Sequence, residues 1–243
     1  MPNSPEDILK KGLEIMGLEL ADEQEALRFF GIYFQELKKW NRKYNLVARN
    51  ATDLQILENH FLDSLTLLPL VQAVKTTFPM EKSCRPHLMD VGTGAGFPGM
   101  VLKIARPQLA TTLVEPRQKR TSFLKHIIRT LRLGEIEVLS GRLGDETDLS
   151  IGPVQAFSYI TSRALTDLAA FLTMVAPYSM PSGLVFCMKG PKGLEEAKHF
   201  QQEEKTSPYR LLAINEWRLP FSQARRFVLV FQHKEEKRQS YET

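Results

Sequence analysis

The residues best suited to chemistry form a glycine-rich segment between Asp90 and Gly99, with the sequence DVGTGAGFPG. An apolar stretch leads into this segment, and a helical pattern follows it. Glycines at Gly92, Gly94 and Gly96 let the backbone turn tightly and let a ligand approach it closely. A turn of this kind lies at the carboxyl end of the first strand of an open α/β sheet, where such sheets bind ligands. The segment therefore predicts a binding loop.

The spacing of the glycines argues against a dinucleotide as the ligand. The dinucleotide fingerprint, G-x-G-x-x-G, would place its third glycine where Phe97 stands, whereas the spacing here is G-x-G-x-G. Asp90 would repel a pyrophosphate but suits a cationic or zwitterionic ligand. S-adenosylmethionine carries a sulfonium and an ammonium and no phosphate, so it suits the loop better. Glu115, 19 residues after Gly96, is expected to accept hydrogen bonds from the two ribose hydroxyls.

Strand and helix patterns alternate on both sides of this loop. Apolar runs predict strands at His87–Val91, Thr111–Val114, Ile136–Leu139, Val154–Ile160, Leu184–Met188, Tyr209–Trp217 and Arg226–Phe231. Helices are predicted at Pro98–Arg106, at Arg117–Leu133 with Gly134 as its cap, at Leu165–Ala176 and at 193–204. This alternation predicts a mostly parallel sheet covered on both faces. No helical pattern separates the last two strands, so at least one of them is expected to run antiparallel.

The first 80 residues show only helical spacing of apolar residues. They predict one helix over roughly Asp22–Trp40 and a second over Leu54–Leu68, which Pro69 ends or kinks. The chain is therefore expected to divide into an N-terminal helical extension, 1–80, and a Rossmann-like α/β domain, 81–243.

Composition sets weaker constraints. The chain has 243 residues, 43% of them hydrophobic, which is enough for one α/β domain with an extension. A net charge of +4 favours polyanionic partners only weakly. Cys84 and Cys187 do not form a metal-binding pattern, so no metal is expected. Without an apolar run of signal-peptide or membrane-spanning length, the protein is expected to be cytoplasmic. The sequence does not give the oligomeric state, and a monomer is taken as the default.

Five motifs carry a resemblance to a known family: WNRKYNLV at 40–47, HFLDSL at 60–65, DVGTGAGFPG at 90–99, TSRA at 161–164 and MKG at 188–190. Together they resemble the bacterial small-subunit ribosomal RNA (guanine-N7) methyltransferase family, RsmG, also called glucose-inhibited division protein B. The resemblance covers roughly residues 35–232. It implies a class I S-adenosylmethionine-dependent methyltransferase fold, with a mostly parallel seven-stranded sheet and an antiparallel late strand. The implied substrate is N7 of a guanine in the decoding-region loop of 16S rRNA, on free rRNA or on a ribosomal subunit.

The resemblance also assigns cofactor contacts. These are Gly92 and Phe97 in the loop, Leu143 and Gly144 after the third strand, and Arg163 after the fourth. The family usually has an acidic residue where Gly144 stands, which leaves only its backbone for such a contact.

Arg163, Lys189 and His60 are the candidates for the substrate side of the site. Arg163 is expected to hold the cofactor carboxylate or an RNA phosphate, and Lys189 a phosphate. Their alternatives are a surface salt bridge and a solvated charge, and for His60 a structural hydrogen bond is an equal alternative. Guanine N7 has an exposed lone pair, so methyl transfer needs orientation rather than a general base. We find no catalytic dyad in the sequence.

Two basic clusters are candidates for an RNA-binding surface. One comprises Lys38, Lys39, Arg42 and Lys43 beside Trp40 and Tyr44, and the other Arg117, Lys119, Arg120, Lys125, Arg129 and Arg132. Basic groups among aromatic rings suit phosphate contact and base stacking, although a solvated helix face is the commoner cause of such runs. Methylation of a small molecule or protein, and nucleoside or RNA binding without catalysis, remain alternatives. A nicotinamide oxidoreductase fits least well because of Phe97.

Overall fold

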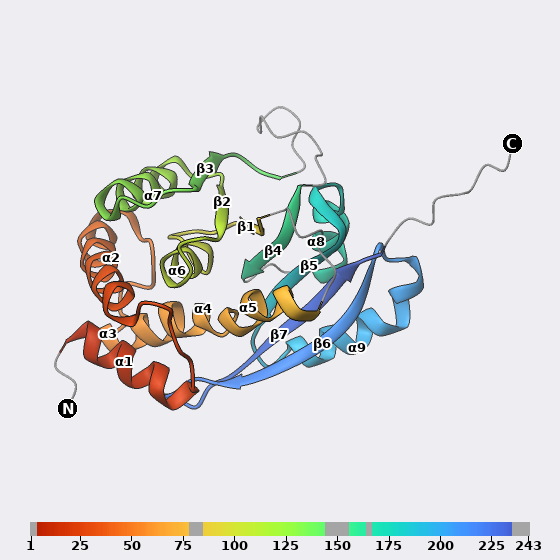
Figure 1. The fold of residues 1–243 in the computed structure, drawn as a ribbon, viewed down its shortest axis with the longest axis horizontal. Helices are drawn as coiled ribbons and strands as arrows, with labels where there is room; N and C mark the ends of the chain where they lie inside the picture. Colours follow the sequence, from red (N-terminus) through yellow and green to blue (C-terminus); the bar gives the residue numbers. More distant parts are fainter. Residues whose placement is uncertain (1–3, 78–84, 144–155, 164–166, 235–243) are drawn as a thin grey trace, which may run out of the picture.

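A computed structural model describes residues 4–77, 85–143, 156–163 and 167–234. These residues form a seven-stranded sheet in the order β3-β2-β1-β4-β5-β7-β6 (Figure 1). The strands are β1 His87–Val91, β2 Ala110–Glu115, β3 Ile136–Ser140, β4 Phe157–Arg163, β5 Ser179–Lys189, β6 Tyr209–Arg218 and β7 Arg225–His233. Strands β1 to β5 pair in parallel, and β7 is antiparallel to both β5 and β6. The predicted mostly parallel sheet with an antiparallel late strand is confirmed.

Helices cover both faces of the sheet. The described helices after β1 are α6 Gly99–Ala105, α7 Gln118–Leu131, α8 Leu168–Val175 and α9 Gly193–Glu203. Alternate residues of β1 point to opposite faces: Leu88 joins the core that contains α6 and α7, and Met89 joins the core that contains α8 and α9. The helices change face where the strand order reverses, between β1 and β4. This point is where doubly wound sheets bind ligands.

Several element boundaries differ from the predictions. Strand β5 begins at Ser179, five residues before its predicted start at Leu184. Strand β4 ends at Arg163 rather than Ile160, because Arg163 still pairs with Met188 of β5. Val154, its predicted start, lies outside the described residues. Helix α7 is capped by Arg132, with φ of 53°, and not by Gly134. The reversal at Arg132 lets Leu133 pack against the core just after the last buried residue of the helix, Leu131, and this packing offsets the cost of a left-handed conformation.

The N-terminal segment is entirely helical where it is described. It forms α1 Pro5–Met16, α2 Glu23–Tyr44, α3 Asp53–Ile56, the π-helix η1 Leu57–Leu62, α4 Asp63–Leu65 and α5 Leu68–Thr77. Helix α2 extends one turn beyond its predicted end. The second predicted helix is interrupted by the π-helix, and Pro69 lies in the first turn of α5, where its missing N–H costs little. The expected boundary near residue 80 falls in 78–84, outside the described residues.

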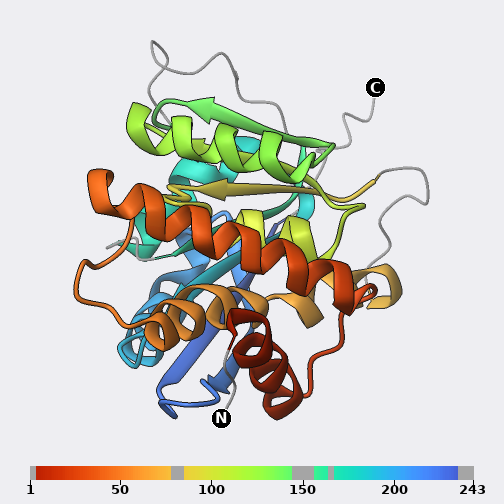
Figure 2. The same ribbon diagram turned by 90° about the vertical axis from the view of Figure 1, so that its left-hand side faces the viewer.

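These helices pack on the side of the sheet that α6 and α7 cover, with α2 alongside α7 (Figure 2). Phe30, Tyr33, Phe34 and Phe61 are fully buried there, in the same core as Leu88 of β1. The N-terminal helices therefore share a core with the sheet and reach the glycine-rich loop that follows β1.

Candidate functional site

The glycine-rich loop follows β1 and adopts a conformation that requires glycine. The φ angles are 71° at Gly92, 64° at Gly94 and 104° at Gly96, all in the range that L side chains rarely adopt. A Cβ atom at Gly96 would also lie 2.5 Å from the Tyr33 hydroxyl oxygen. At Gly92, by contrast, no atom of the described residues other than its chain neighbours lies within 4 Å of the Cβ position, so the loop borders open space there.

Most amide groups of this loop already have acceptors within the protein. Gly92 and Thr93 both donate to the carbonyl of Val114, and Gly96 donates to the carbonyl of Thr93. Gly94 donates to Oε2 of Glu115 at 2.9 Å. A phosphate-binding loop needs such amides for its anion, so this loop suits a ligand without phosphate.

Asp90 lies behind the loop. It is fully buried, and its Oδ2 accepts hydrogen bonds from the Thr93 hydroxyl at 2.6 Å and from the Gly99 amide at 2.8 Å. Burial raises the pKa of Asp90 to about 6, although both hydrogen bonds oppose the shift. The structure thus places Asp90 where it ties the loop to the start of α6, rather than at the surface of the loop.

Glu115 ends β2 beside Gly94. Besides the Gly94 amide, its carboxylate accepts a hydrogen bond from the amide of Arg117 at 3.0 Å, and Nη1 of Arg120 lies 3.7 Å away. Only 2% of Glu115 is exposed. The carboxylate is therefore at the predicted place, but a ribose reaches it only if the Arg120 guanidinium moves.

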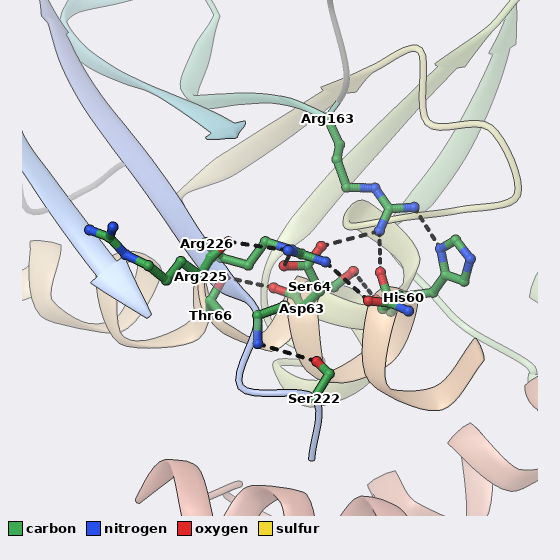
Figure 3. Close-up of polar contacts among 10 residues, drawn as sticks. His60, Asp63, Ser64, Thr66, Arg163, Ser222, Arg225 and Arg226 are labelled. Atoms are coloured by element: carbon green, nitrogen blue, oxygen red, sulfur yellow. Dashed lines mark hydrogen bonds and ion pairs between the residues drawn. The ribbon is translucent and has the colours of Figure 1, made fainter. Parts of the chain in front are cut away.

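Arg163, at the end of β4, joins the loop to the π-helix. Its guanidinium lies 5.5 Å from the centre of the Phe97 ring, which stacks on the His60 ring at 4.9 Å. Nη2 contacts Nδ1 of His60 at 2.8 Å, and Nη1 donates to the Asn59 carbonyl at 2.8 Å (Figure 3). The structure thus brings together Arg163, His60 and Phe97, three of the predicted site residues.

His60 acts as an acceptor in this arrangement. Burial, together with the charge of Arg163, lowers the pKa of His60 to about 3. The ring is therefore neutral near pH 7, and its Nδ1 accepts the hydrogen bond from Arg163. A ring this weakly basic does not suit proton abstraction at neutral pH, and it orients Arg163 instead.

Asp63 contacts the same Arg163 guanidinium. Its Oδ2 is 3.5 Å from Nη1 of Arg163, and its Oδ1 is 3.3 Å from Nε of Arg226 in β7. Arg226 also donates to Oδ1 of Asn59 at 3.0 Å. Burial raises the pKa of Asp63, while the two guanidinium groups oppose the shift and favour the carboxylate.

A cavity of about 190 Å³ opens beside Arg163 and Asp63. It is lined by Asp63, Thr66, Arg163, Met188, Lys189, Gly190, Arg226, Phe227 and Val228. Lys189 belongs to its wall, but the side chain is only 9% exposed and its Nζ lies 2.6 Å from Oε2 of Glu196 on α9. A phosphate at Lys189 would therefore compete with Glu196.

Of the two cofactor contacts expected after the third strand, only one lies in the described part of the chain. Leu143 is buried in the core that also contains Met89, Val91 and Val114. Gly144 lies outside the described residues.

Comparison with known proteins identifies the family to which the chain belongs. A family model described as GidB, rRNA small subunit methyltransferase G, matches residues 26–225. The chain belongs to the rRNA small subunit methyltransferase G family. The family expected from the motifs is therefore confirmed.

Two relatives of this family are similar over nearly their whole length. Ribosomal RNA small subunit methyltransferase G of Desulfotalea psychrophila is 42% identical over 91% of this chain and 95% of its own. The protein of the same name from Geobacter sulfurreducens is 35% identical over 88% and 91%. Among solved structures, a SAM dependent methyltransferase from Aquifex aeolicus has a TM-score of 0.50 at 17% identity, over 70% of this chain and 93% of that one. This structural likeness supports the predicted class I methyltransferase fold.

Asp63, Arg226 and Tyr33 are residues of the candidate site that the sequence did not predict. Asp63 stands inside the HFLDSL motif, three residues after His60, and the motif alone was sufficient to single it out. Arg226 lies at the start of a mostly apolar strand, and nothing in that strand pattern indicates a site residue. Tyr33, whose hydroxyl donates to the carbonyl of Ala95, is one of many apolar-face residues of α2.

The two basic clusters meet in the folded protein. Nζ of Lys43 on α2 and Nζ of Lys119 on α7 lie 5.4 and 5.8 Å from the centre of the same ring, that of Tyr44. Because α7 follows β2 directly, this joint surface borders the edge of the sheet that carries the glycine-rich loop. The fold thus forms one basic face from two segments that are far apart in the sequence.

Across the described residues, no group of three or more acidic, histidine or cysteine side chains could hold a metal ion. The helices described are also too short or too polar to span a membrane.

Proposed function

We propose that this protein transfers a methyl group from S-adenosylmethionine to N7 of a guanine in the decoding-region loop of small-subunit rRNA. One observation carries the proposal: a loop that suits a ligand without phosphate is joined, through Phe97 and Arg163, to a cavity at the same edge of the sheet. The names of the relatives, which specify small-subunit ribosomal RNA, support the substrate.

The loop fits S-adenosylmethionine in three respects. Most of its amides have acceptors within the protein, the space at Gly92 is open, and an acidic side chain, Glu115, stands beside Gly94. We assign the cofactor contacts to Gly92, Phe97, Glu115 and Arg163, with Leu143 in the supporting core. Asp90, Gly94 and Gly96 then hold the loop in shape. When bound, S-adenosylmethionine supplies a methyl group made electrophilic by its sulfonium.

The residues of the chain supply orientation and electrostatics. Guanine N7 is already nucleophilic, so catalysis needs the base held in line with the methyl group rather than a proton acceptor. Neutral His60 and the Asn59 carbonyl fix the guanidinium of Arg163 beside the Phe97 ring. We therefore propose that Arg163, besides its contact with the cofactor, also contacts the substrate base, that His60 positions Arg163, and that Lys189 shapes the cavity wall.

The basic face around Tyr44 is proposed to hold the RNA by its phosphates. Binding by phosphate neutralisation releases counterions and so weakens with salt. Because small-subunit rRNA is the proposed substrate, alone or in a subunit, we expect the protein to act in the cytoplasm. We take it to act as a monomer by default.

The proposal is tested by transfer of a labelled methyl group to small-subunit rRNA from cells that lack this protein. Borohydride reduction and aniline cleavage of the RNA at 7-methylguanine, followed by primer extension, then locate the labelled base. Label on a single guanine N7 is expected. If S-adenosylmethionine binds but no RNA is labelled, the rRNA substrate is wrong, and a small molecule or a protein becomes the candidate substrate.

A further inference from the structure

We propose that the cavity beside Arg163 receives the target base, and that Asp63 selects guanine there. The inference rests on the proposed function, because it names the contacts that the methylated base makes. Enzymes that modify a base take it out of the stack into a pocket, where its edges are read by hydrogen bonds.

The carboxylate of Asp63 has unused capacity as an acceptor. The side chain is only 5% exposed and lines the cavity, and Oδ1 accepts no hydrogen bond from the described residues, although it is within 3.3 Å of Nε of Arg226. A carboxylate offers about four lone-pair sites, and buried polar atoms without a hydrogen bond are rare in proteins. A ligand with two adjacent N–H groups would use this capacity.

The order of side chains matches the order of groups on guanine. Around the base, N7 and O6 are acceptors, and N1–H and the N2 amine, which follow, are donors. In the structure, Arg163 contacts both neighbours: its guanidinium lies 5.5 Å from the centre of the Phe97 ring, and its Nη1 lies 3.5 Å from Oδ2 of Asp63. If Arg163 donates to O6 and Asp63 accepts from N1–H and the N2 amine, N7 faces the loop.

The same arrangement rejects adenine. Its N6 amine would meet the donors of Arg163, and its N1 acceptor would meet the Asp63 carboxylate. Buried polar groups left without partners are the strongest means of discrimination between similar ligands. Arg226, held by Oδ1 of Asn59 at 3.0 Å, supports the selection because its positive charge favours the ionised form of Asp63.

The experiment compares two full-length small-subunit rRNAs, joined from synthetic segments, that carry guanine or inosine at the methylated position. Inosine lacks the N2 amine but keeps N7, O6 and N1–H. For the unaltered protein, we expect kcat/KM on the inosine RNA to be roughly tenfold lower, since one hydrogen bond to a charged group is lost. Equal methylation of the two RNAs overturns the inference without any variant having to fold.

The variant Asp63→Asn tests whether this residue is the cause. It is expected to lower kcat/KM on the guanine RNA and to bring the guanine-to-inosine ratio close to one, because its amide no longer presents two acceptors. Asp167→Asn, at the exposed N-cap of α8, is the matched control and keeps the ratio of the unaltered protein. Thermal unfolding shows whether each variant is folded.

A folded Asp63→Asn protein that keeps the original ratio overturns the assignment of Asp63. If Asp63 has a purely structural role, Asp63→Asn lowers methylation of both RNAs equally, and this result also contradicts the assignment of Asp63 to guanine selection. Failure of the proposed function gives a different result, because the unaltered protein would then label neither RNA. In that case the proposed base pocket would be wrong as well.

Discussion

At the scale of single residues, Tyr33 connects the N-terminal helices to the glycine-rich loop. Its hydroxyl donates to the Ala95 carbonyl, and its ring stacks on Phe97 at 5.5 Å. Tyr33→Phe keeps the ring and leaves the carbonyl without its partner, at a cost of about 1 kcal/mol in the free energy of unfolding. We expect the Kd for S-adenosylmethionine, measured by calorimetry, to rise severalfold. Tyr178→Phe, on the opposite face of the sheet, is the control, and an unchanged Kd in Tyr33→Phe would refute the role.

His60 gives a second prediction at this scale, which concerns pH. Its pKa is about 3 in the folded protein and near 6.5 when unfolded. Below pH 6.5 the unfolded chain binds a proton that the folded protein does not, so His60 lowers the stability as the pH falls from 6.5 towards 3. His60→Asn keeps an acceptor for Arg163 but does not titrate. Its unfolding free energy, followed by urea denaturation at pH 7.5 and 5, is expected to fall less than that of the unaltered protein, with methyl transfer retained. Equal losses would contradict the burial of a neutral His60.

At the scale of elements, helices α2 and α7 supply the basic face around Tyr44. Reversing two exposed charges, Arg42→Glu with Lys119→Glu, is expected to lower kcat/KM for rRNA by roughly tenfold or more and to flatten its dependence on salt, because fewer phosphates are neutralised. The affinity for S-adenosylmethionine should stay unchanged. Lys198→Glu with Lys205→Glu, near α9, is the matched control. If both double variants behave alike, net charge and not this face governs RNA binding.

Elements with a regular period were also what the sequence predicted best. The apolar runs located β1 because a strand buried on both faces leaves a clear apolar run. The resemblance implied the mostly parallel sheet with an antiparallel late strand, and the order of the strands came only from the structure. The π-helix Leu57–Leu62 was missed, since one extra residue per turn leaves almost the same pattern as an α-helix. The cap at Arg132 was missed because tertiary packing of Leu133 overrides the local preference for glycine. The site residues show the same contrast. The glycine-rich loop is a local motif that the sequence displays directly, whereas Asp63 and Arg226 come together only after folding.

At the scale of the whole molecule, the described structure has a core that crosses the expected division near residue 80. Phe61, from the N-terminal helices, contacts the Tyr33 ring at 5.1 Å and the Phe97 ring of the loop at 5.3 Å. Separating the two parts would expose these rings, and burial of such apolar surface is the main source of stability. The N-terminal extension and the α/β domain should therefore unfold together.

The two tryptophans make this testable, because Trp40 lies on α2 and Trp217 on β6. Both pack against the shared core. The single-tryptophan variants Trp40→Phe and Trp217→Phe each report one part by fluorescence during urea unfolding. We expect both fluorescence transitions to coincide with the circular dichroism transition of the same variant, as in a two-state process. A Trp40 transition that precedes loss of the sheet would mean that residues 1–80 are a separable domain, and that the glycine-rich loop can lose its support from Tyr33 while the sheet stays folded.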